Sequence, residues 1–164
     1  MNRCVRESLV RGRWSVQQAK VAAALAHCKT KAGPKVGVLG FCYGGHPACY
    51  ASATDADVKV GVVFHPSMQL ETFAFGGDTA KLMAQVGCPF LICPAGDDFK
   101  FWAEDSDFSK ALKTSKAGSA CVWKPFPDMK HGWSCRGDLG DAAVKRDVEL
   151  ALNEAKAFLA AHLK

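Results

Sequence analysis

Residues 35–45 read KVGVLGFCYGG, and their pattern indicates how the chain folds. Its first part, residues 35–41, is apolar and rich in β-branched side chains, which is typical of a strand buried within a sheet. The segment from Tyr43 to about Ala53 follows a glycine-rich turn and is rich in small residues, which favours a helix. The stretch therefore predicts a strand, a sharp turn and a helix in direct succession.

The same alternation continues along the chain. Strands are expected at residues 35–41, 58–65, 89–93 and 119–126, and helices at residues 14–30, 43–53, 78–86, 103–116 and 140–163. Strands that alternate with helices form parallel βαβ units with right-handed crossovers, and the helices cover both faces of the sheet. We therefore predict an α/β fold in which residues 1–164 form one domain, a three-layer sandwich around a mostly parallel sheet.

The composition is that of a globular protein, since 49% of the 164 residues are hydrophobic and 23% are charged. The net charge of +5 is concentrated at one end, because residues 1–35 hold eight Lys or Arg and one acid. That distribution argues against a nucleic-acid partner, and no apolar run approaches the roughly 18 residues that span a bilayer. We expect a cytoplasmic protein with no membrane partner, whose basic start is an ordinary solvated segment rather than a targeting signal.

The eight cysteines lack the paired spacing of a zinc site or a CxxC motif. A secretory signal is not recognisable, and the apolar strands supply a core that does not depend on disulfides. We therefore expect reduced thiols. Cys49, Cys88, Cys93 and Cys121 lie in or near apolar segments and are expected to be buried.

Gly40, Cys42 and Gly44 form a G-x-C-x-G pattern at the turn after the first strand. This is the pattern of a nucleophile elbow with cysteine in place of serine, in which the flanking glycines leave room for a strained turn. The helix that follows directs its amide groups at the same point, which lowers the pKa of a thiol and offers the Tyr43 N–H to a developing oxyanion. A glycine-rich turn around a merely buried cysteine is the alternative interpretation.

Two further candidates follow the third and fourth strands. Asp98 lies in the turn after the third strand, and His131 lies in the loop after the fourth. Each is a weak signal alone, but the order of nucleophile, acid and histidine, each after a strand, is that of α/β-hydrolase triads. We predict that Cys42, Asp98 and His131 converge as a catalytic triad.

We expect the other polar residues near the strand ends to have structural roles. His65 follows the second strand and is expected to make structural hydrogen bonds, and Asp97 is expected to be a surface turn residue. His46 is expected to be structural or solvated, and Trp102 is expected to pack in the core.

The segments GFCYGG (40–45), FHPS (64–67), CPAGDD (93–98) and FPDMKHGWSCRGD (126–138) resemble the dienelactone hydrolases, in particular their eukaryotic branch. The resemblance runs from about Trp14 to the C-terminus. It implies hydrolysis of a small-molecule lactone or activated ester, with Cys42 as the nucleophile, His131 as the base and Asp98 as the acid that orients the base.

The resemblance also implies two binding roles. The backbone N–H of Tyr43 would form part of the oxyanion hole, and Arg136 would bind a substrate carboxylate. Neither a metal nor a cofactor is implied.

The α/β-hydrolase sheet has about four more strands before this point, and a loop among them supplies the second oxyanion donor. The domain is therefore expected to be N-terminally incomplete, so that the strand at residues 35–41 has an exposed apolar edge that favours self-association. Two other functions stay open. One is a catalytically dead relative that serves as a binding module, and the other is a redox-sensing thiol protein that depends on Cys42.

Overall fold

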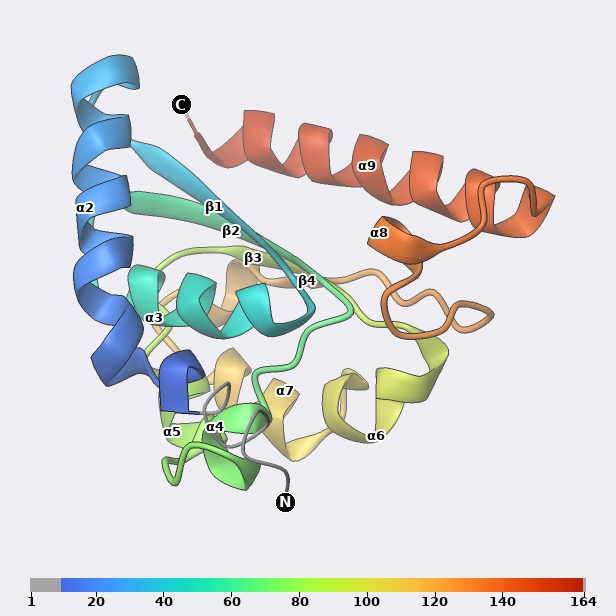
Figure 1. Ribbon diagram of the computed structural model, residues 1–164, viewed down its shortest axis with the longest axis horizontal. Helices are drawn as coiled ribbons and strands as arrows, with labels where there is room; N and C mark the ends of the chain where they lie inside the picture. Colours follow the sequence, from blue (N-terminus) through green and yellow to red (C-terminus); the bar gives the residue numbers. More distant parts are fainter. Residues whose placement is uncertain (1–9, 164) are drawn as a thin grey trace.

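The computed structural model describes residues 10–163, apart from the side chain of residue 99 (Figure 1). The elements in chain order are α2 (Trp14–Ala32), β1 (Val36–Phe41), α3 (Gly45–Thr54), β2 (Val58–Phe64), α4 (Leu70–Phe73), α5 (Thr79–Ala84), β3 (Phe90–Cys93), α6 (Phe99–Trp102), α7 (Asp107–Lys113), β4 (Val122–Trp123), α8 (Trp133–Arg136) and α9 (Ala142–His162). Residues 1–9, which carry part of the basic start and Cys4, lie outside the described residues.

The four strands form one parallel sheet in the order β1-β2-β3-β4. The register pairs Phe41 with Phe64 and Phe64 with Cys93, so the first three strands end level with one another. Beyond β3 and β4, a parallel bridge between Ala95 and Phe126 continues the pairing. The turns that follow the strands therefore leave the sheet at one edge, where the predicted triad residues are located.

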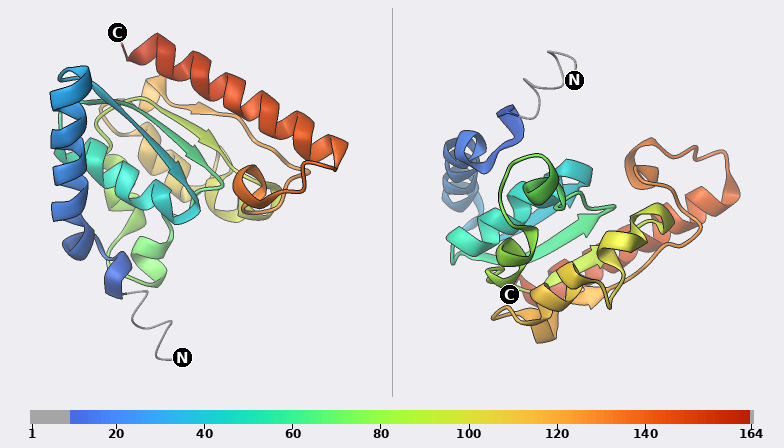
Figure 2. Two further views of the ribbon diagram at one scale, coloured as in Figure 1. Left: turned by 45° about the horizontal axis from the view of Figure 1, so that its top comes forward. Right: turned by 90° about the horizontal axis from the view of Figure 1, so that it is seen from below.

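Helices cover both faces of the sheet, which confirms the predicted three-layer sandwich (Figures 1 and 2). On one face, α3, α5 and α7 enclose a core that includes Val63, Ile92 and Trp102. On the other face, α9 lies across β2 and β3 and closes a second cluster around Val62 and Leu91. Successive residues of β2 and β3 point to opposite faces, so a strand between two helical layers must be apolar on both sides.

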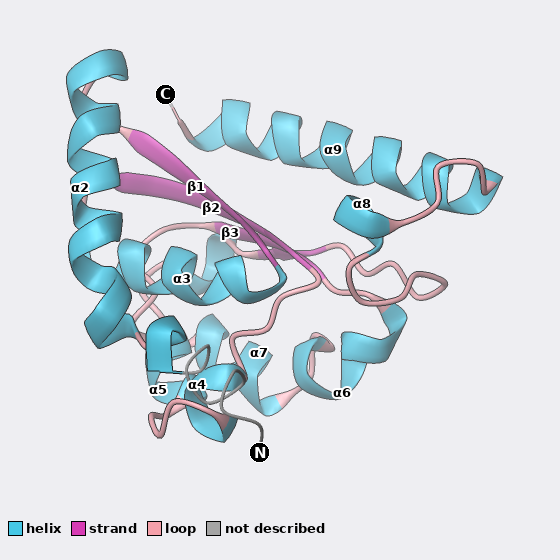
Figure 3. Cartoon of the chain, in the orientation of Figure 1, coloured by secondary structure: helices cyan, strands magenta, loops and turns pink. Residues whose placement is uncertain are grey.

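Three one-turn helices, α4, α6 and α8, were not predicted (Figure 3). Four residues are too few for a helical periodicity to appear in the sequence. The helix expected at residues 103–116 is restricted to α7, since Ser106 caps its start by accepting a hydrogen bond of 3.2 Å from the Ser109 N–H. Within residues 10–163, no helix has both the length and the apolar character needed to cross a membrane.

The last strand is shorter than the expected residues 119–126. A 3-10 turn at Gly118–Ala120 occupies its first part. After β4, Pro125 has no N–H to donate, and the ladder resumes only where the Phe126 N–H donates to the Pro94 carbonyl at 2.9 Å. The short strand still delivers its following loop to the same edge as the others.

β1 pairs with β2 alone among the described residues and forms one edge of the sheet. Leu39 on this strand is 45% exposed. The sequence predicted a buried strand here, and the edge position is the physical reason that this side chain is not covered.

Candidate active site

Cys42 lies on the sharp turn between β1 and α3, and its backbone φ is 53°. Non-glycine residues rarely adopt this left-handed region, so the surrounding structure must hold it there. A Cβ at Gly40 would lie 2.4 Å from the Gly44 carbonyl oxygen, whereas a Cβ at Gly44 would meet nothing within 4 Å. The crowded positions are therefore Gly40 and also Gly45, where a Cβ would lie 2.7 Å from Met68 Sδ. The expectation that Gly44 makes room for the turn is wrong.

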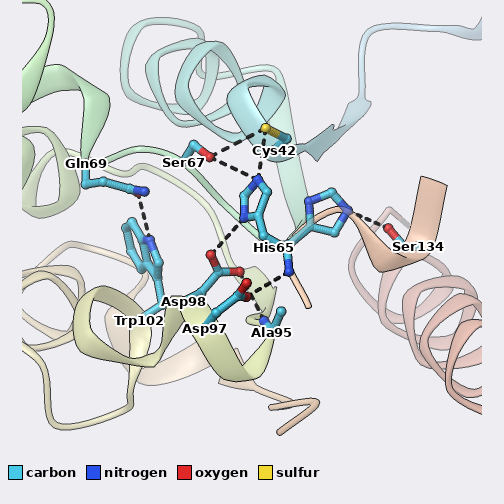
Figure 4. A network of polar contacts seen from close by, with 10 residues as sticks. Cys42, His65, Ser67, Gln69, Ala95, Asp97, Asp98, Trp102 and Ser134 are labelled. Atoms are coloured by element: carbon cyan, nitrogen blue, oxygen red, sulfur yellow. Dashed lines mark hydrogen bonds and ion pairs between the residues drawn. The ribbon is translucent and has the colours of Figure 1, made fainter. Parts of the chain in front are cut away.

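His131 bridges Cys42 and Asp98 with its two ring nitrogens. Nε2 lies 3.1 Å from Cys42 Sγ, and Nδ1 lies 2.8 Å from Asp98 Oδ1. Asp98 comes from the turn after β3 and also accepts a hydrogen bond of 3.1 Å from the Ala95 N–H. Figure 4 shows Cys42 and Asp98 at opposite ends of this chain of contacts. The structure thus brings together the three side chains that the sequence predicted to converge.

The contacts define which ring nitrogen of His131 carries the proton. A carboxylate only accepts hydrogen bonds, so Nδ1–H donates to Asp98 and the lone pair of Nε2 faces the thiol. In this tautomer, His131 is able to take the proton of Cys42.

The surroundings also favour charge separation between Cys42 and His131. Burial raises the pKa of the Cys42 thiol, but hydrogen bonds with His131, with Ser67 and with a backbone N–H outweigh it, so the pKa is lowered. Burial by itself would lower the pKa of His131. The hydrogen bonds with Cys42 and Asp98 have a larger and opposite effect, so the pKa of His131 is raised. Burial raises the pKa of Asp98, and the hydrogen bond with His131 offsets only part of that effect. The first two shifts both act in the direction that favours transfer of the Cys42 proton to His131.

Asp97 contacts the backbone of His131, which the sequence did not predict. Its Oδ1 accepts a hydrogen bond of 2.7 Å from the His131 N–H. The two loops are also joined by the Gly96 N–H, which donates to the Met129 carbonyl at 2.9 Å. Adjacent acids therefore hold the same histidine, Asp97 by its main chain and Asp98 by its ring. The pair of acids after Gly96 was the available signal.

Ser67 is a second residue that the sequence did not single out. Its Oγ lies 3.6 Å from Cys42 Sγ and 3.5 Å from His131 Nε2. Ser67 follows the end of β2 by three residues and is buried. The available signals were its position near the carboxyl edge of a parallel sheet and its place in the segment FHPS (64–67).

His65 makes the structural hydrogen bond expected of it and also contacts the site. Its Nε2 lies 2.7 Å from Ser134 Oγ, and its ring lies edge-on to the His131 ring with 4.9 Å between centroids. Burial, and secondarily the charge of His131, lowers the pKa of His65 to about 4. Its φ of 36° is left-handed, like that of Cys42. His65 therefore packs as a neutral ring beside His131 and ties it to α8.

Tyr43 directly follows the elbow cysteine. Its backbone N–H contributes to the lowered pKa of the Cys42 thiol. Its phenol donates a hydrogen bond of 2.6 Å to the Gly12 carbonyl, and its ring packs against Phe75. The side chain is thus fixed at its far end, which holds the N–H in place beside the sulfur.

Arg136 lies on α8, on the exposed surface near His131. The guanidinium lies over Gly132, where a Cβ would be 2.2 Å from one of its terminal nitrogens. Arg136, Lys130 and His131 line the same cavity of about 400 Å³, which Asp128 and other neighbours complete. His131 lines this cavity and Cys42 does not, so the cavity meets the candidate triad at the histidine.

A second polar cluster lies at the start of α3, beyond Tyr43. His46 Nε2 is 2.7 Å from Glu71 Oε2, and the Tyr50 hydroxyl donates to Glu71 Oε1 at 2.7 Å. All three are wholly or partly buried, and the cluster connects α3 to α4. In the described part of the chain, no three His, Cys, Asp or Glu side chains gather closely enough to hold a metal ion.

The profile of the dienelactone hydrolase family matches residues 4–163. A search of curated proteins finds no significant match.

Solved structures share the fold at low sequence identity. A Klebsiella pneumoniae protein assigned as a dienelactone hydrolase has a TM-score of 0.64 and 13% identity, over 87% of this chain and 59% of its own. A dienelactone hydrolase-like promiscuous phosphotriesterase from metagenomic libraries has a TM-score of 0.60 and 20% identity, over 88% of this chain and 62% of its own. An acylaminoacyl peptidase from Pyrococcus horikoshii has a TM-score of 0.60 and 15% identity, over 85% of this chain and 26% of its own. The fold is therefore that of the α/β-hydrolases, and the chain spans about three fifths of the length of the first two structures.

Proposed function

The chain belongs to the dienelactone hydrolase family, and we propose that it hydrolyses lactones or activated esters through a thioester on Cys42. The observation that carries the proposal is the imidazole of His131, which lies 3.1 Å from Cys42 Sγ and 2.8 Å from Asp98 Oδ1. A base within this distance of a thiol, and itself oriented by a carboxylate, is the arrangement that activates a nucleophile.

Acylation begins with a proton transfer. Nε2 of His131 takes the Cys42 proton, and the thiolate attacks the carbonyl carbon of the substrate to form a carbon–sulfur bond. The carbonyl oxygen becomes an oxyanion and accepts a hydrogen bond from the Tyr43 N–H. The intermediate then expels the ester oxygen, which takes the proton back from His131 and leaves a thioester.

Water completes the cycle. His131 removes a proton from a water molecule as its oxygen attacks the thioester carbon, and the sulfur leaves as a thiolate. A thiolate attacks most effectively where the substrate has a good leaving group, which favours enol-lactones and activated esters over simple alkyl esters.

The cavity beside His131 supports an anionic substrate group. Lys130 and Arg136 line it together with Asp128 and Asp141, and a guanidinium binds a carboxylate with two parallel hydrogen bonds. Under this proposal, Arg136→Gln weakens binding of a carboxylate-bearing ester and leaves a neutral ester unaffected.

The test uses the 164-residue protein and p-nitrophenyl acetate. We expect slow turnover, together with a Cys42-bound acetyl group that mass spectrometry detects after rapid acid quenching. Cys42→Ala should abolish both signals, and Cys28→Ala, which removes an exposed thiol on α2, should change neither. Hydrolysis that persists in Cys42→Ala would refute the thioester route.

A redox-sensing thiol is the second candidate. The lowered pKa and partial exposure of Cys42 favour it, because exposed thiolates are the targets of peroxide. Reversible loss of the Cys42 thiol under mild peroxide, in a protein that does not turn over esters, would select this function instead.

A further inference from the structure

Ser67 contacts both reacting groups of the site. Its Oγ lies 3.6 Å from Cys42 Sγ and 3.5 Å from His131 Nε2, while the sulfur and Nε2 are themselves 3.1 Å apart. The Cys42 sulfur, the Ser67 hydroxyl oxygen and Nε2 of His131 therefore form a triangle, and each atom comes from a different segment of the chain (Figure 4). Of the side chains described, His131 and Ser67 are the two whose hydrogen-bonding atoms lie within reach of the sulfur.

The backbone fixes Ser67 in this position. Its N–H donates a hydrogen bond of 3.0 Å to the carbonyl of Cys42, so each residue holds the other at the strained turn. Ser67 is only 6% exposed, and the next residue, Met68, is 1% exposed. Gln69 accepts a hydrogen bond of 3.2 Å from the Trp102 indole, which ties this segment to α6. A hydroxyl held this firmly loses little entropy when it makes a hydrogen bond.

The Cys42 thiolate can accept a hydrogen bond from the Ser67 hydroxyl. After the proton transfer, Nε2–H of His131 donates to the thiolate. A thiolate has lone pairs left for a further donor, and the Ser67 hydroxyl is within the distance at which sulfur accepts. Hydrogen bonds to an ionised partner are stronger than those to a neutral one.

We propose that the Ser67 hydroxyl donates a hydrogen bond to the Cys42 thiolate and stabilises the charge-separated pair with His131. Ser67 is then a positioning residue that increases the fraction of nucleophile ready to react. Its contribution to turnover rests on the proposed function, but its contribution to thiolate formation does not.

Replacement of Ser67 removes none of the ionisable groups that surround the Cys42 sulfur. His131 is in direct contact with it, Asp98 lies behind the histidine, and the His65 ring is 4.9 Å from the His131 ring. Asp97 binds the His131 N–H. A change in thiol ionisation in Ser67→Ala therefore reports the hydroxyl itself.

The experiment measures the rate at which iodoacetamide alkylates Cys42 between pH 5 and 9, with the Cys42 peptide quantified by mass spectrometry. Ser67→Ala should move the midpoint of the profile to higher pH, so that the rate at pH 6.5 falls about three- to tenfold. The rates of the two proteins should converge toward pH 9, because a growing fraction of both thiols is then ionised. Ser67→Thr keeps a hydroxyl and should recover most of the shift.

Ser115→Ala is the matched control. Ser115 is 8% exposed, and its hydroxyl has no hydrogen-bond partner among the described residues. Its replacement should leave the profile in place. An unshifted profile in Ser67→Ala, an equal loss of rate at every pH, or an equal shift in Ser67→Thr would each overturn the proposal.

The pH profile of Cys42 alkylation tests the role of Ser67 independently of the proposed function. Alkylation requires a thiolate and no ester turnover. A shifted profile in a protein that hydrolyses no ester would support the role of Ser67 and refute the hydrolase, and an unshifted profile in an active hydrolase would do the reverse.

Discussion

The carboxylate of Asp97 accepts a hydrogen bond of 2.7 Å from the backbone N–H of His131. The neighbouring carboxylate of Asp98 binds the ring of the same histidine at 2.8 Å. One 3-10 turn after β3 thus fixes both the loop and the imidazole, which must be held within a fraction of an ångström for proton transfer to be efficient.

Replacement of the two acids should separate these contributions. Asp98→Asn is expected to lower kcat/KM for p-nitrophenyl acetate about 10³- to 10⁴-fold, because an amide donates to Nδ1 and favours the wrong tautomer of His131. Asp97→Ala should cost about tenfold, since it removes one hydrogen bond to the loop. Asp97→Asn keeps an acceptor oxygen and should stay near the native rate. Equal losses in Asp98→Asn and Asp97→Asn would contradict the assigned roles.

The residues that could be predicted are those whose motif and position agree. Cys42, Asp98 and His131 each lie in a short motif after an apolar strand, so the chain order alone was informative. Ser67 and Asp97 lie in the segments FHPS (64–67) and CPAGDD (93–98), but these segments alone do not show which of their polar residues contact the triad. Their role depends on the register, which places the end of β2 level with the end of β1, and on the close approach of two loops. The exposure of Leu39 depends equally on sheet order, which composition does not report.

Cys42 should be the most reactive of the described thiols. Its pKa is lowered, whereas burial raises the pKa of Cys88 and of Cys93 to about 12. Because the thiolate is the nucleophile, Cys42 should react at a pH below 9 where the buried thiols do not. Alkylation with limiting iodoacetamide, followed by peptide mapping, measures the order of labelling. Labelling that begins at the exposed Cys135 would count against an activated Cys42.

Gly40 should tolerate no side chain. An added Cβ would lie 2.4 Å from the Gly44 carbonyl oxygen and 2.7 Å from the Gly45 nitrogen, both of which are backbone atoms with little freedom to move. We expect Gly40→Ala to lower the free energy of unfolding by about 2 to 4 kcal/mol and to abolish rapid alkylation of Cys42. Gly44→Ala is the matched control: its φ of −58° is helical and its Cβ would be in open space. Urea unfolding should find it within about 1 kcal/mol of the native protein.

His65 should make stability depend on pH. Burial lowers its pKa to about 4, below the roughly 6.5 of an unfolded histidine. The unfolded chain therefore binds an extra proton between these values, so the free energy of unfolding falls as the pH drops from 6.5 to 4 and this contribution then levels off. From pH 7 to 4.5 the loss from this residue is on the order of 2 kcal/mol. His65→Asn tolerates the left-handed φ and should reduce the loss by that amount in urea titrations at the two pH values. Parallel losses in both proteins would show that His65 is not responsible.

The exposed edge of β1 should promote self-association. β1 pairs only with β2 among the described residues, and Leu39 is 45% exposed on it. An unpaired apolar edge offers backbone N–H and C=O groups and hydrophobic surface to a second copy of the chain. We expect the native protein to show a concentration-dependent increase in mass by sedimentation equilibrium.

Leu39→Lys should weaken the association at least about tenfold, because a charge on an edge strand opposes pairing. Val16→Lys provides the control, since Val16 is comparably exposed at 42% but lies on α2, away from the strand edge. If Val16→Lys disperses the assembly as well as Leu39→Lys does, or if the native protein stays monomeric at all concentrations, then the β1 edge is not an association surface.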